Sequence, residues 1–323
     1  MKEIKITENE AQQRLDRFLR KYLPDYKLGD IYKLFRNKKV KVNSKREKEN
    51  YMLQLDDVIQ LYIAGGEDSA PKEAVVIPAK PVEVVYEDDN LLLVNKPFGV
   101  LTHPDQPGDR DTLIDRALYH LSQQEGYTLS PTFTPATCNR LDRNTGGIVV
   151  VAKNYTSLKA VNKLIRERGI QKLYLCVVKG VIKEAGEVKN FLLKDQEQNK
   201  VEILEQQEEG AKGVHTKYRP LATDGTYSLM EVELITGRAH QIRAHFASMG
   251  HPIVGDTKYG DPKTNQIFFE KFKLKHQFLY AYRLAFKESE EGLDYLKGKS
   301  FQSKLPDSFE KIRQQLFDKR VKE

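Results

Sequence analysis

The chain has 323 residues, 39% hydrophobic and 31% charged, a composition typical of a globular protein long enough for two domains. It contains no run of about 18 apolar residues and no apolar stretch after a basic start, so neither a transmembrane helix nor a signal peptide is expected. Its two cysteines, Cys138 and Cys176, lie far apart without CxxC spacing. They suggest neither a disulfide framework nor a zinc knuckle, and they favour a cytoplasmic protein with two buried thiols.

The positive charge is concentrated near the start of the chain. Residues 1–64 contain 15 Lys and Arg against 10 Asp and Glu, which accounts for most of the net charge of +7. No acid interrupts the segment between Ile31 and Arg46, whose cations are Lys33, Arg36, Lys38, Lys39, Lys41, Lys45 and Arg46. Such a run suits the phosphate oxygens of RNA, although a solvated helix face is the alternative.

Residues 1–66 predict a small domain of two helices followed by short strands. Apolar residues at helical spacing predict helices over 11–23 and 29–39, the first ended by Pro24 and the second capped by Asp30. Strands are expected at 40–43 and 56–64. Residues 67–80 contain Pro and Ala without periodicity and are interpreted as a flexible linker, which would let the small domain find RNA.

Residues 81–323 predict a larger second domain. Its expected strands are a pair within 82–97 turning at Asp88–Asn90, followed by 146–153, 173–182, 217–222 and 227–236. Its expected helices are 111–124, 157–169 and 237–250, the last capped by Thr236 and ended by Gly250. Strands outnumber helices and several are linked by hairpins. The predicted class is therefore α+β, with a mixed, mostly antiparallel sheet flanked by helices.

Three segments carry most of the reactive side chains: 95–103, 138–153 and 235–260. In the second, Asp142 lies between Arg140 and Arg143, just before a turn that leads into a buried strand. Flanking guanidinium groups keep such a carboxylate ionised, so it could act as a nucleophile or a base. A surface ion pair beside a turn explains this segment equally well.

The third segment contains three histidines and two arginines within a short distance, at positions 238, 240, 243, 245 and 251. The histidines raise a zinc hypothesis, but His240 and His245 are five residues apart and would lie about 140° apart around a helix. No metal is therefore expected. Arg238, at the expected start of the helix, is instead predicted to bind phosphate.

Taken together, the three segments resemble the RluA-type family of pseudouridine synthases, which act mainly on large-subunit ribosomal RNA. The sequence NRLDRNTGG is similar to that family's HRLDxxTSG, and Thr236–Gly260 is similar to its TGRxHQIRxHxxxxGHPIxGDxxYG. Lys96–Gly99 fits its Lys-Pro-x-Gly element. Asn139 and Gly146 depart from the family's His and Ser, which leaves local RNA contacts and the choice of uridine open. The first 66 residues resemble an S-four-like RNA-binding domain, through RLDRFL and KVKVN.

The resemblance implies the pseudouridine synthase fold, an isomerase activity and a role for each of four residues. Asp142 corresponds to the essential aspartate, Tyr174 to the tyrosine that packs on the target base, and Arg243 to the arginine that pairs with the aspartate. Arg140 corresponds to the arginine that helps displace the uridine from its stack. The reaction cleaves the bond from ribose to the base nitrogen, rotates the uracil and rejoins it through carbon. It requires no cofactor, and neither GxGxxG nor GxxxxGK occurs.

The expected partner is RNA, with large-subunit ribosomal RNA favoured over transfer RNA, no membrane, and a monomer as the working assumption. A non-catalytic RNA-binding protein with a decayed synthase domain is one alternative, which the intact Asp142, Tyr174 and Arg243 disfavour. A glycosidase is another, but it needs two carboxylates, and no second acid lies within ten residues of Asp142.

Overall fold

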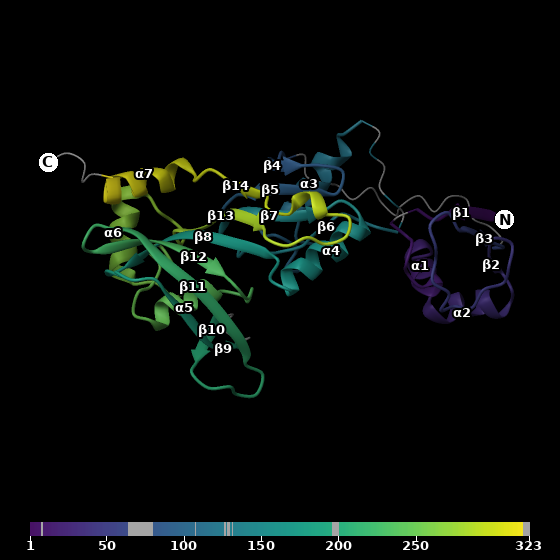
Figure 1. Ribbon diagram of the computed structural model, residues 1–323, viewed down its shortest axis with the longest axis horizontal. Helices are drawn as coiled ribbons and strands as arrows, with labels where there is room; N and C mark the ends of the chain where they lie inside the picture. Colours follow the sequence, from purple (N-terminus) through teal and green to yellow (C-terminus); the bar gives the residue numbers. More distant parts are fainter. Residues whose placement is uncertain are drawn as a thin grey trace.

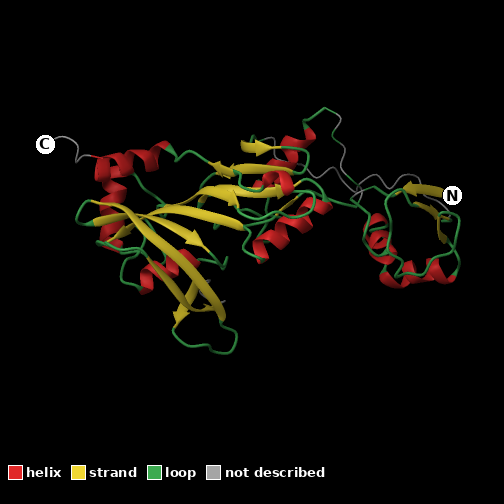
Figure 2. Ribbon diagram, in the orientation of Figure 1, coloured by secondary structure: helices red, strands yellow, loops and turns green. Residues whose placement is uncertain are grey.

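A computed structural model of the chain describes residues 1–7, 9–63, 80–106, 108–125, 127, 130, 132–195 and 200–318. These residues form a three-stranded sheet near the amino terminus and an eleven-stranded sheet in the rest of the chain. Figure 1 shows the amino-terminal unit at one end of the molecule, and Figure 2 shows helices along the borders of the large sheet. None of the helices among these residues has the length and apolar character needed to cross a lipid bilayer.

The amino-terminal unit contains both predicted helices and both predicted strands. Its elements are β1 (Lys2–Lys5), α1 (Leu15–Tyr22), α2 (Leu28–Arg36), β2 (Val40–Val42) and β3 (Val58–Leu61). The strands pair antiparallel in the order β1-β3-β2, and the helices pack Leu15, Phe18 and Ile31 into a common core. Strand β1 was not predicted, because the sequence KEIK contains only one apolar residue.

The predicted cap of α2 is wrong. Asp30 lies inside the first turn, because the helix already begins at Leu28, and the N-cap residue is Lys27 without a capping side chain. The Asp30 carboxylate pairs instead with Lys33 at 2.8 Å.

The rest of the chain forms the large mixed sheet and the helices that flank it. Its strands are β4 (Glu83–Glu87), β5 (Leu91–Lys96), β6 (Ala136–Thr137), β7 (Gly146–Ala152), β8 (Ile170–Lys179), β9 (Gly186–Asp195), β10 (Lys200–Leu204), β11 (Lys212–Thr223), β12 (Tyr227–Leu234), β13 (Leu279–Phe286) and β14 (Ser300–Gln302). Its helices are α3 (Leu113–Ser122), α4 (Tyr155–Arg166), α5 (Gln241–Ser248), α6 (Pro262–Phe272) and α7 (Asp307–Phe317), with a 3-10 turn at Asp294–Leu296.

The strand order of this sheet is β10-β9-β11-β12-β8-β13-β7-β5-β4, with β14 on β13 and β6 on β7. Within the described residues, β13 and β7 run parallel and the other pairs are antiparallel, which confirms the predicted α+β class. The expected strands at 146–153, 173–182 and 227–236 and the expected helices at 111–124 and 157–169 are confirmed within a few residues. The strand expected at 217–222 is present but begins earlier, at Lys212.

The centre of the sheet is buried on both faces. Val149 and Val151 of β7 pack in a cluster that includes Leu113 and Leu121 of α3. Ile148 and Val150, on the other face of β7, pack in a cluster with α4. Two-sided burial explains why β7 is apolar at every position rather than at alternate ones.

Helix α5 begins later than the sequence predicts. Its N-cap is His240, in a left-handed conformation (φ 54°, ψ 11°), so the predicted cap Thr236 is wrong. The Thr236 hydroxyl instead donates to Gln241 Oε1 at 2.9 Å and accepts from the His215 amide at 2.8 Å. Arg238 consequently precedes the helix. Gly250, with φ 78°, follows the C-cap residue Met249, as predicted.

The amino-terminal unit contacts the larger unit directly through a buried acid. Glu10, which is 4% exposed, accepts hydrogen bonds from the hydroxyls of Ser130, at 2.8 Å, and Thr132. Lys159 Nζ donates to Gln12 Oε1 at 2.9 Å. The predicted linker, 67–80, lies outside the described residues except for Lys80.

Gly147 offers a test of the β7–β13 pairing that supports the site described below. Its φ is 117°, and a Cβ there would lie 2.2 Å from the carbonyl oxygen of Ala281 in β13. We expect Gly147→Ala to lower the free energy of unfolding by more than about 3 kcal/mol, because both the backbone and the strand pairing must adjust.

The matched control is Gly225→Ala, which also has a positive φ, 93°, but has no atom within 4 Å of the added Cβ. It should lose only about 1 kcal/mol from the left-handed backbone. Urea unfolding of both variants measures the difference, and equal losses would show that the close approach to β13 is unimportant.

Candidate active site

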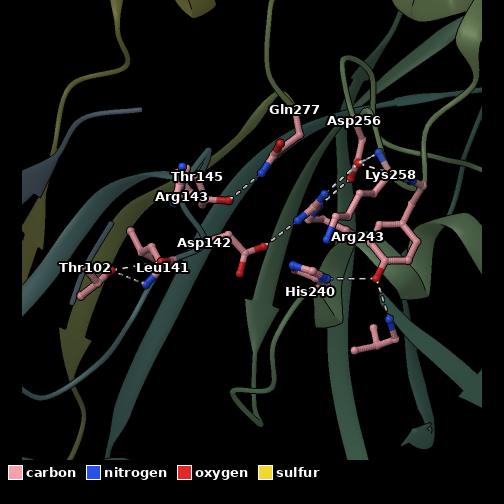
Figure 3. A network of polar contacts seen from close by, with 12 residues as sticks. Thr102, Leu141, Asp142, Arg143, Thr145, His240, Arg243, Asp256, Lys258 and Gln277 are labelled. Atoms are coloured by element: carbon pink, nitrogen blue, oxygen red, sulfur yellow. Dashed lines mark hydrogen bonds and ion pairs between the residues drawn. The ribbon is translucent and has the colours of Figure 1, made fainter. Parts of the chain in front are cut away.

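Asp142 lies in the loop between β6 and β7, and its neighbours anchor this loop to the segment after β5. The Leu141 amide donates to the Thr102 hydroxyl at 3.2 Å, and that hydroxyl donates to the Leu141 carbonyl at 3.0 Å. The Gly99 amide donates to the Arg143 carbonyl at 2.9 Å. The loop is thereby held on both sides of Asp142, and the side chain keeps a defined direction (Figure 3).

Lys96 also holds the backbone of the same loop. It is fully buried, and its Nζ donates to the carbonyls of Pro97 (3.0 Å), Val100 (2.6 Å) and Arg143 (3.0 Å). Burial lowers the pKa of Lys96 to about 7, although the negative charge of Asp142 acts in the opposite direction and raises it. Three acceptors need three hydrogens, and only the ammonium form has them. The ammonium form of Lys96 therefore links the Asp142 loop to the turn after β5.

Arg243 in α5 connects Asp142 to a second, deeper carboxylate. Its Nε and Nη2 donate to the two oxygens of Asp256 at 2.6 and 2.9 Å, and its Nη1 donates to Asp142 Oδ2 at 2.9 Å (Figure 3). Burial raises the pKa of Asp256, but the Arg243 guanidinium and the amides of Lys258 and Tyr259 outweigh it and hold that pKa below its usual value. The pairing of Arg243 with Asp142 that the sequence suggested is present.

The Asp142 side chain remains 22% exposed, whereas those of Arg243 and Asp256 are 6% and 0% exposed. Within the described part of the chain, its second oxygen, Oδ1, accepts no hydrogen bond. One carboxylate oxygen is therefore fixed by the protein, and the other is available to a substrate.

A narrow inner pocket opens beside this carboxylate. Asp142, Arg140, Tyr174, Arg238 and Arg243 all line it, so five of the predicted residues come together. Its other lining residues are Leu141, Thr145, Leu234, His240, Gln241, Ile242 and Leu279. Tyr174 in β8 is 5% exposed, and burial, aided by the charge of Asp142, raises the pKa of its phenol, so the hydroxyl stays neutral. A flat apolar wall beside a carboxylate suits a planar base.

The inner pocket continues into a wider polar cleft. The two share Arg140, Leu141, Asp142, His240 and Arg243, and the cleft adds the cations Arg143, Lys194 and Lys258. Five cations against the two acids Asp105 and Asp142 give the cleft an excess of positive charge, which attracts polyanions. This excess of positive charge suits a phosphodiester chain lying along the cleft.

Three comparisons with known proteins identify the family. A family model described as RNA pseudouridylate synthase matches residues 90–248. The chain is 34% identical over 294 residues to ribosomal large subunit pseudouridine synthase C of Salmonella typhimurium, and 33% identical over 290 residues to that of Vibrio cholerae; in both cases 88% of each protein is covered. This chain is an RNA pseudouridine synthase. The fold agrees with human RNA pseudouridylate synthase domain containing 4, with a TM-score of 0.58 at 24% identity over 72% of this chain and 92% of that one.

The remaining predicted RNA-binding residues lie elsewhere in the synthase. Lys33, Arg36, Lys38, Lys39 and Lys45 are exposed on the amino-terminal unit, along α2 and the turns on either side of β2. Lys41 is half-buried, with its Nζ 5.2 Å from the centre of the Tyr62 ring. These residues form a basic face separate from the pocket.

Both departures from the family motif have a local structural explanation in this synthase. Asn139 Oδ1 accepts from the Val150 amide at 2.8 Å, so its side chain is bonded to the backbone of β7. At Gly146, a Cβ would lie 3.1 Å from the rings of Phe98 and Tyr280. A serine there would crowd two aromatic rings, and glycine accommodates them.

Sequence reasoning missed three residues of the site: Lys96, Asp256 and His240 were seen only within motifs or as doubtful zinc ligands. The histidines have separate partners, since His240 Nδ1 lies 3.0 Å from the Tyr259 hydroxyl and His245 Nδ1 lies 2.7 Å from the Thr216 hydroxyl. The spacing of His240 and Asp256 along the chain contains no signal of a shared site. Only the fold brings them to Asp142.

Replacement of Lys96 by methionine tests whether the buried ammonium holds the Asp142 loop. Methionine has a similar length but leaves the Pro97 and Val100 carbonyls without a donor, and the Arg143 carbonyl with the Gly99 amide alone. We expect the free energy of unfolding to fall by about 2–4 kcal/mol. Turnover of RNA should fall further than stability alone explains, because the Arg143 carbonyl, next to Asp142, loses one of its two hydrogen bonds.

Lys153→Met is the matched control, since Lys153 is also largely buried but pairs with Glu87, away from the pocket. It should lose stability without a specific loss of turnover. Chemical denaturation and initial rates on the same preparations provide both readouts. A Lys96→Met enzyme with wild-type stability and rate would rule out the anchoring role.

Proposed function

We propose that this synthase converts uridines of large-subunit ribosomal RNA to pseudouridine, with Asp142 acting on the ribose of the target nucleotide. The observation that carries the proposal is the 2.9 Å contact of Arg243 with one oxygen of Asp142, whose side chain is 22% exposed and lines a cleft with an excess of positive charge. The names of the bacterial relatives support ribosomal RNA as the substrate class. A ribosomal substrate would place the enzyme in the cytoplasm.

The site supports a division of roles among the lining residues. A target uridine must leave its stack to reach Asp142, which costs a few kcal/mol, and Arg140 at the pocket mouth would occupy the space it leaves. Tyr174 would pack on the uracil, contributing about 1–3 kcal/mol. Arg243 is held by Asp256 and orients the Asp142 carboxylate, so that Oδ1 faces the nucleotide as a nucleophile or a base. No cofactor takes part in this scheme.

The amino-terminal unit would add affinity without taking part in the chemical step. We propose that its basic face and Arg238 bind phosphate groups, with residues 1–66 as an S-four-like RNA-binding domain and residues 81–323 as the catalytic domain. Exposed lysines and arginines supply such contacts without reading the base sequence. The contacts of Glu10 with Ser130 and Thr132 would keep this face in a defined position beside the catalytic unit.

Asp142→Asn tests the catalytic assignment. The amide keeps the shape of the side chain but loses its charge and nucleophilicity, so pseudouridine formation should be abolished while RNA affinity stays within a few-fold. The measurement is mass spectrometry of nucleosides from unmodified large-subunit ribosomal RNA and, in parallel, unmodified transfer RNA after incubation with enzyme. Asp89→Asn, in the exposed β4–β5 turn, is the control and should remain active.

Substantial product from Asp142→Asn would remove the catalytic assignment. Product in transfer RNA alone would overturn the ribosomal substrate and leave the reaction intact. Mapping the modified positions in the productive RNA then identifies the target uridines.

Neutralising part of the basic face tests its role in binding phosphate. The variant carries Arg36→Gln, Lys39→Gln and Lys45→Gln, all at exposed positions. If each residue contacts one phosphate, the slope of log affinity against log salt should decrease by about 2 units, with turnover at saturating RNA retained.

The control replaces three exposed lysines of α6 and α7, Lys263, Lys271 and Lys311, by glutamine. These helices lie at the end of the molecule opposite the amino-terminal unit (Figure 1). An equal change of slope in both variants would show a general effect of charge rather than a binding face.

A further inference from the structure

His240 occupies an unusual position in the wall of the inner pocket. It is the N-cap residue of α5 and has a left-handed backbone, a conformation that costs a residue with a side chain about 1–2 kcal/mol. Its ring packs edge-on against Tyr259, with centroids 5.6 Å apart, and Nδ1 lies 3.0 Å from the Tyr259 hydroxyl. In Figure 3 the end of the ring opposite this hydrogen bond lies toward Asp142.

The Tyr259 hydroxyl determines which ring nitrogen carries the hydrogen. Its oxygen accepts a hydrogen bond from the Val201 amide at 2.8 Å. Burial raises the pKa of Tyr259, so the phenol keeps its proton. Among the described residues, His240 Nδ1 is the acceptor within reach of that proton, so the hydroxyl donates to Nδ1. A neutral imidazole that accepts at Nδ1 must carry its hydrogen on Nε2.

Burial, together with two neighbouring cations, favours the neutral form of the His240 ring. Burial has the largest effect and lowers its pKa, and Arg243 and Lys258 act in the same direction. Asp142 and Asp256 act against them, but the pKa remains below its usual value. At neutral pH the pocket is therefore lined by a neutral imidazole with an N–H at Nε2.

We propose that His240 is a catalytic residue of this synthase, whose Nε2–H donates a hydrogen bond to a carbonyl oxygen of the target uracil while the glycosidic bond breaks. The inference depends on the proposed function of the Asp142 pocket. His240 lines that pocket together with Asp142 and Tyr174, between which the nucleotide would lie.

The reaction develops negative charge on the uracil, which a hydrogen-bond donor can stabilise. When the bond between C1′ and N1 breaks, the electron pair stays with the uracil and spreads to the carbonyl oxygen beside N1. A fixed donor aimed at developing charge stabilises it without reorganisation. C5 then bonds to C1′, the proton on C5 leaves and N1 takes up a proton. The Nε2 hydrogen of His240 is not transferred, so the ring ends each cycle as it began.

The tautomer disfavours a different role, in which His240 removes the C5 proton. A base needs a lone pair facing the substrate, and here the lone pair of the neutral ring lies at Nδ1, occupied by Tyr259. Tyr259 is accordingly a positioning residue, since it acts through His240.

The test uses the full-length enzyme and large-subunit ribosomal RNA transcribed with tritium at uridine C5, which is released when C5 bonds to ribose. Asparagine tolerates the left-handed backbone but does not reach as far as Nε2. In single turnover, His240→Asn should be about 100-fold slower, as expected for loss of one donor to a developing charge, with RNA affinity unchanged. His240→Gln, whose amide N–H reaches the Nε2 position, should recover to within about 10-fold.

Tyr259→Phe should change how the rate depends on pH, which a purely structural role of His240 would not do. Without the hydroxyl, the neutral ring can place its hydrogen on either nitrogen, so the rate should fall several-fold at about pH 8. The protonated ring carries a hydrogen on each nitrogen. The difference in rate between Tyr259→Phe and the wild-type enzyme should therefore become smaller as the pH falls to about 5.5. His120→Asn, whose histidine pairs with Glu87 away from the pocket, is the control.

A wild-type rate for His240→Asn, or equal losses for the Asn and Gln variants, would overturn the proposal while Asp142→Asn remained inactive. Absence of tritium release by the wild-type enzyme, or release by Asp142→Asn, would instead contradict the proposed function on which it depends. A pH-independent deficit in Tyr259→Phe would contradict the role of the tautomer.

Discussion

The structure of the site depends on a buried guanidinium shared by two carboxylates. Arg243 gives two of its donors to Asp256, which is fully buried, and a third to Asp142, which faces the pocket. Removing one partner of a buried ion pair typically costs about 3–5 kcal/mol, because the other charge is left uncompensated. The Arg243–Asp256 pair is consequently rigid. It presents a single N–H in a fixed direction, and Asp142 takes its orientation from that N–H.

The rest of the fold maintains this geometry from the opposite side. Strand β7 is central, apolar on both faces and paired in parallel with β13, so the loop that precedes it starts from a rigid base. Lys96 joins this loop to the turn after β5. A reactive group on a loop is well positioned when the backbone on both sides of it is held by hydrogen bonds. Asp142 meets this condition through Thr102 on one side and Gly99 on the other.

The sequence predicted the fold class, most elements and the five residues that share the pocket. A continuous apolar pattern was sufficient to predict β7, and an alternating one to predict β12. The family-like motifs were sufficient to predict that Asp142 and Arg243 pair. Helix starts were predicted less well. Asp30 and Thr236 are good capping residues, but helix α2 begins at Leu28 and α5 at Gln241, so neither residue occupies the N-cap position. The left-handed His240 and the buried Asp256 depend on contacts between distant segments, for which spacing contains no signal.

The central claim is that Arg243 acts through geometry and not through charge alone. Arg243→Lys keeps the positive charge but replaces a planar fork by one ammonium group, which cannot contact both carboxylates in the same way. The decisive measurement is the single-turnover rate of this variant on large-subunit ribosomal RNA, with RNA affinity measured alongside. We predict a rate at least about 100-fold below wild type with nearly unchanged affinity, because misplacement of a catalytic group by about 1 Å has that effect. A rate equal to wild type would contradict the account.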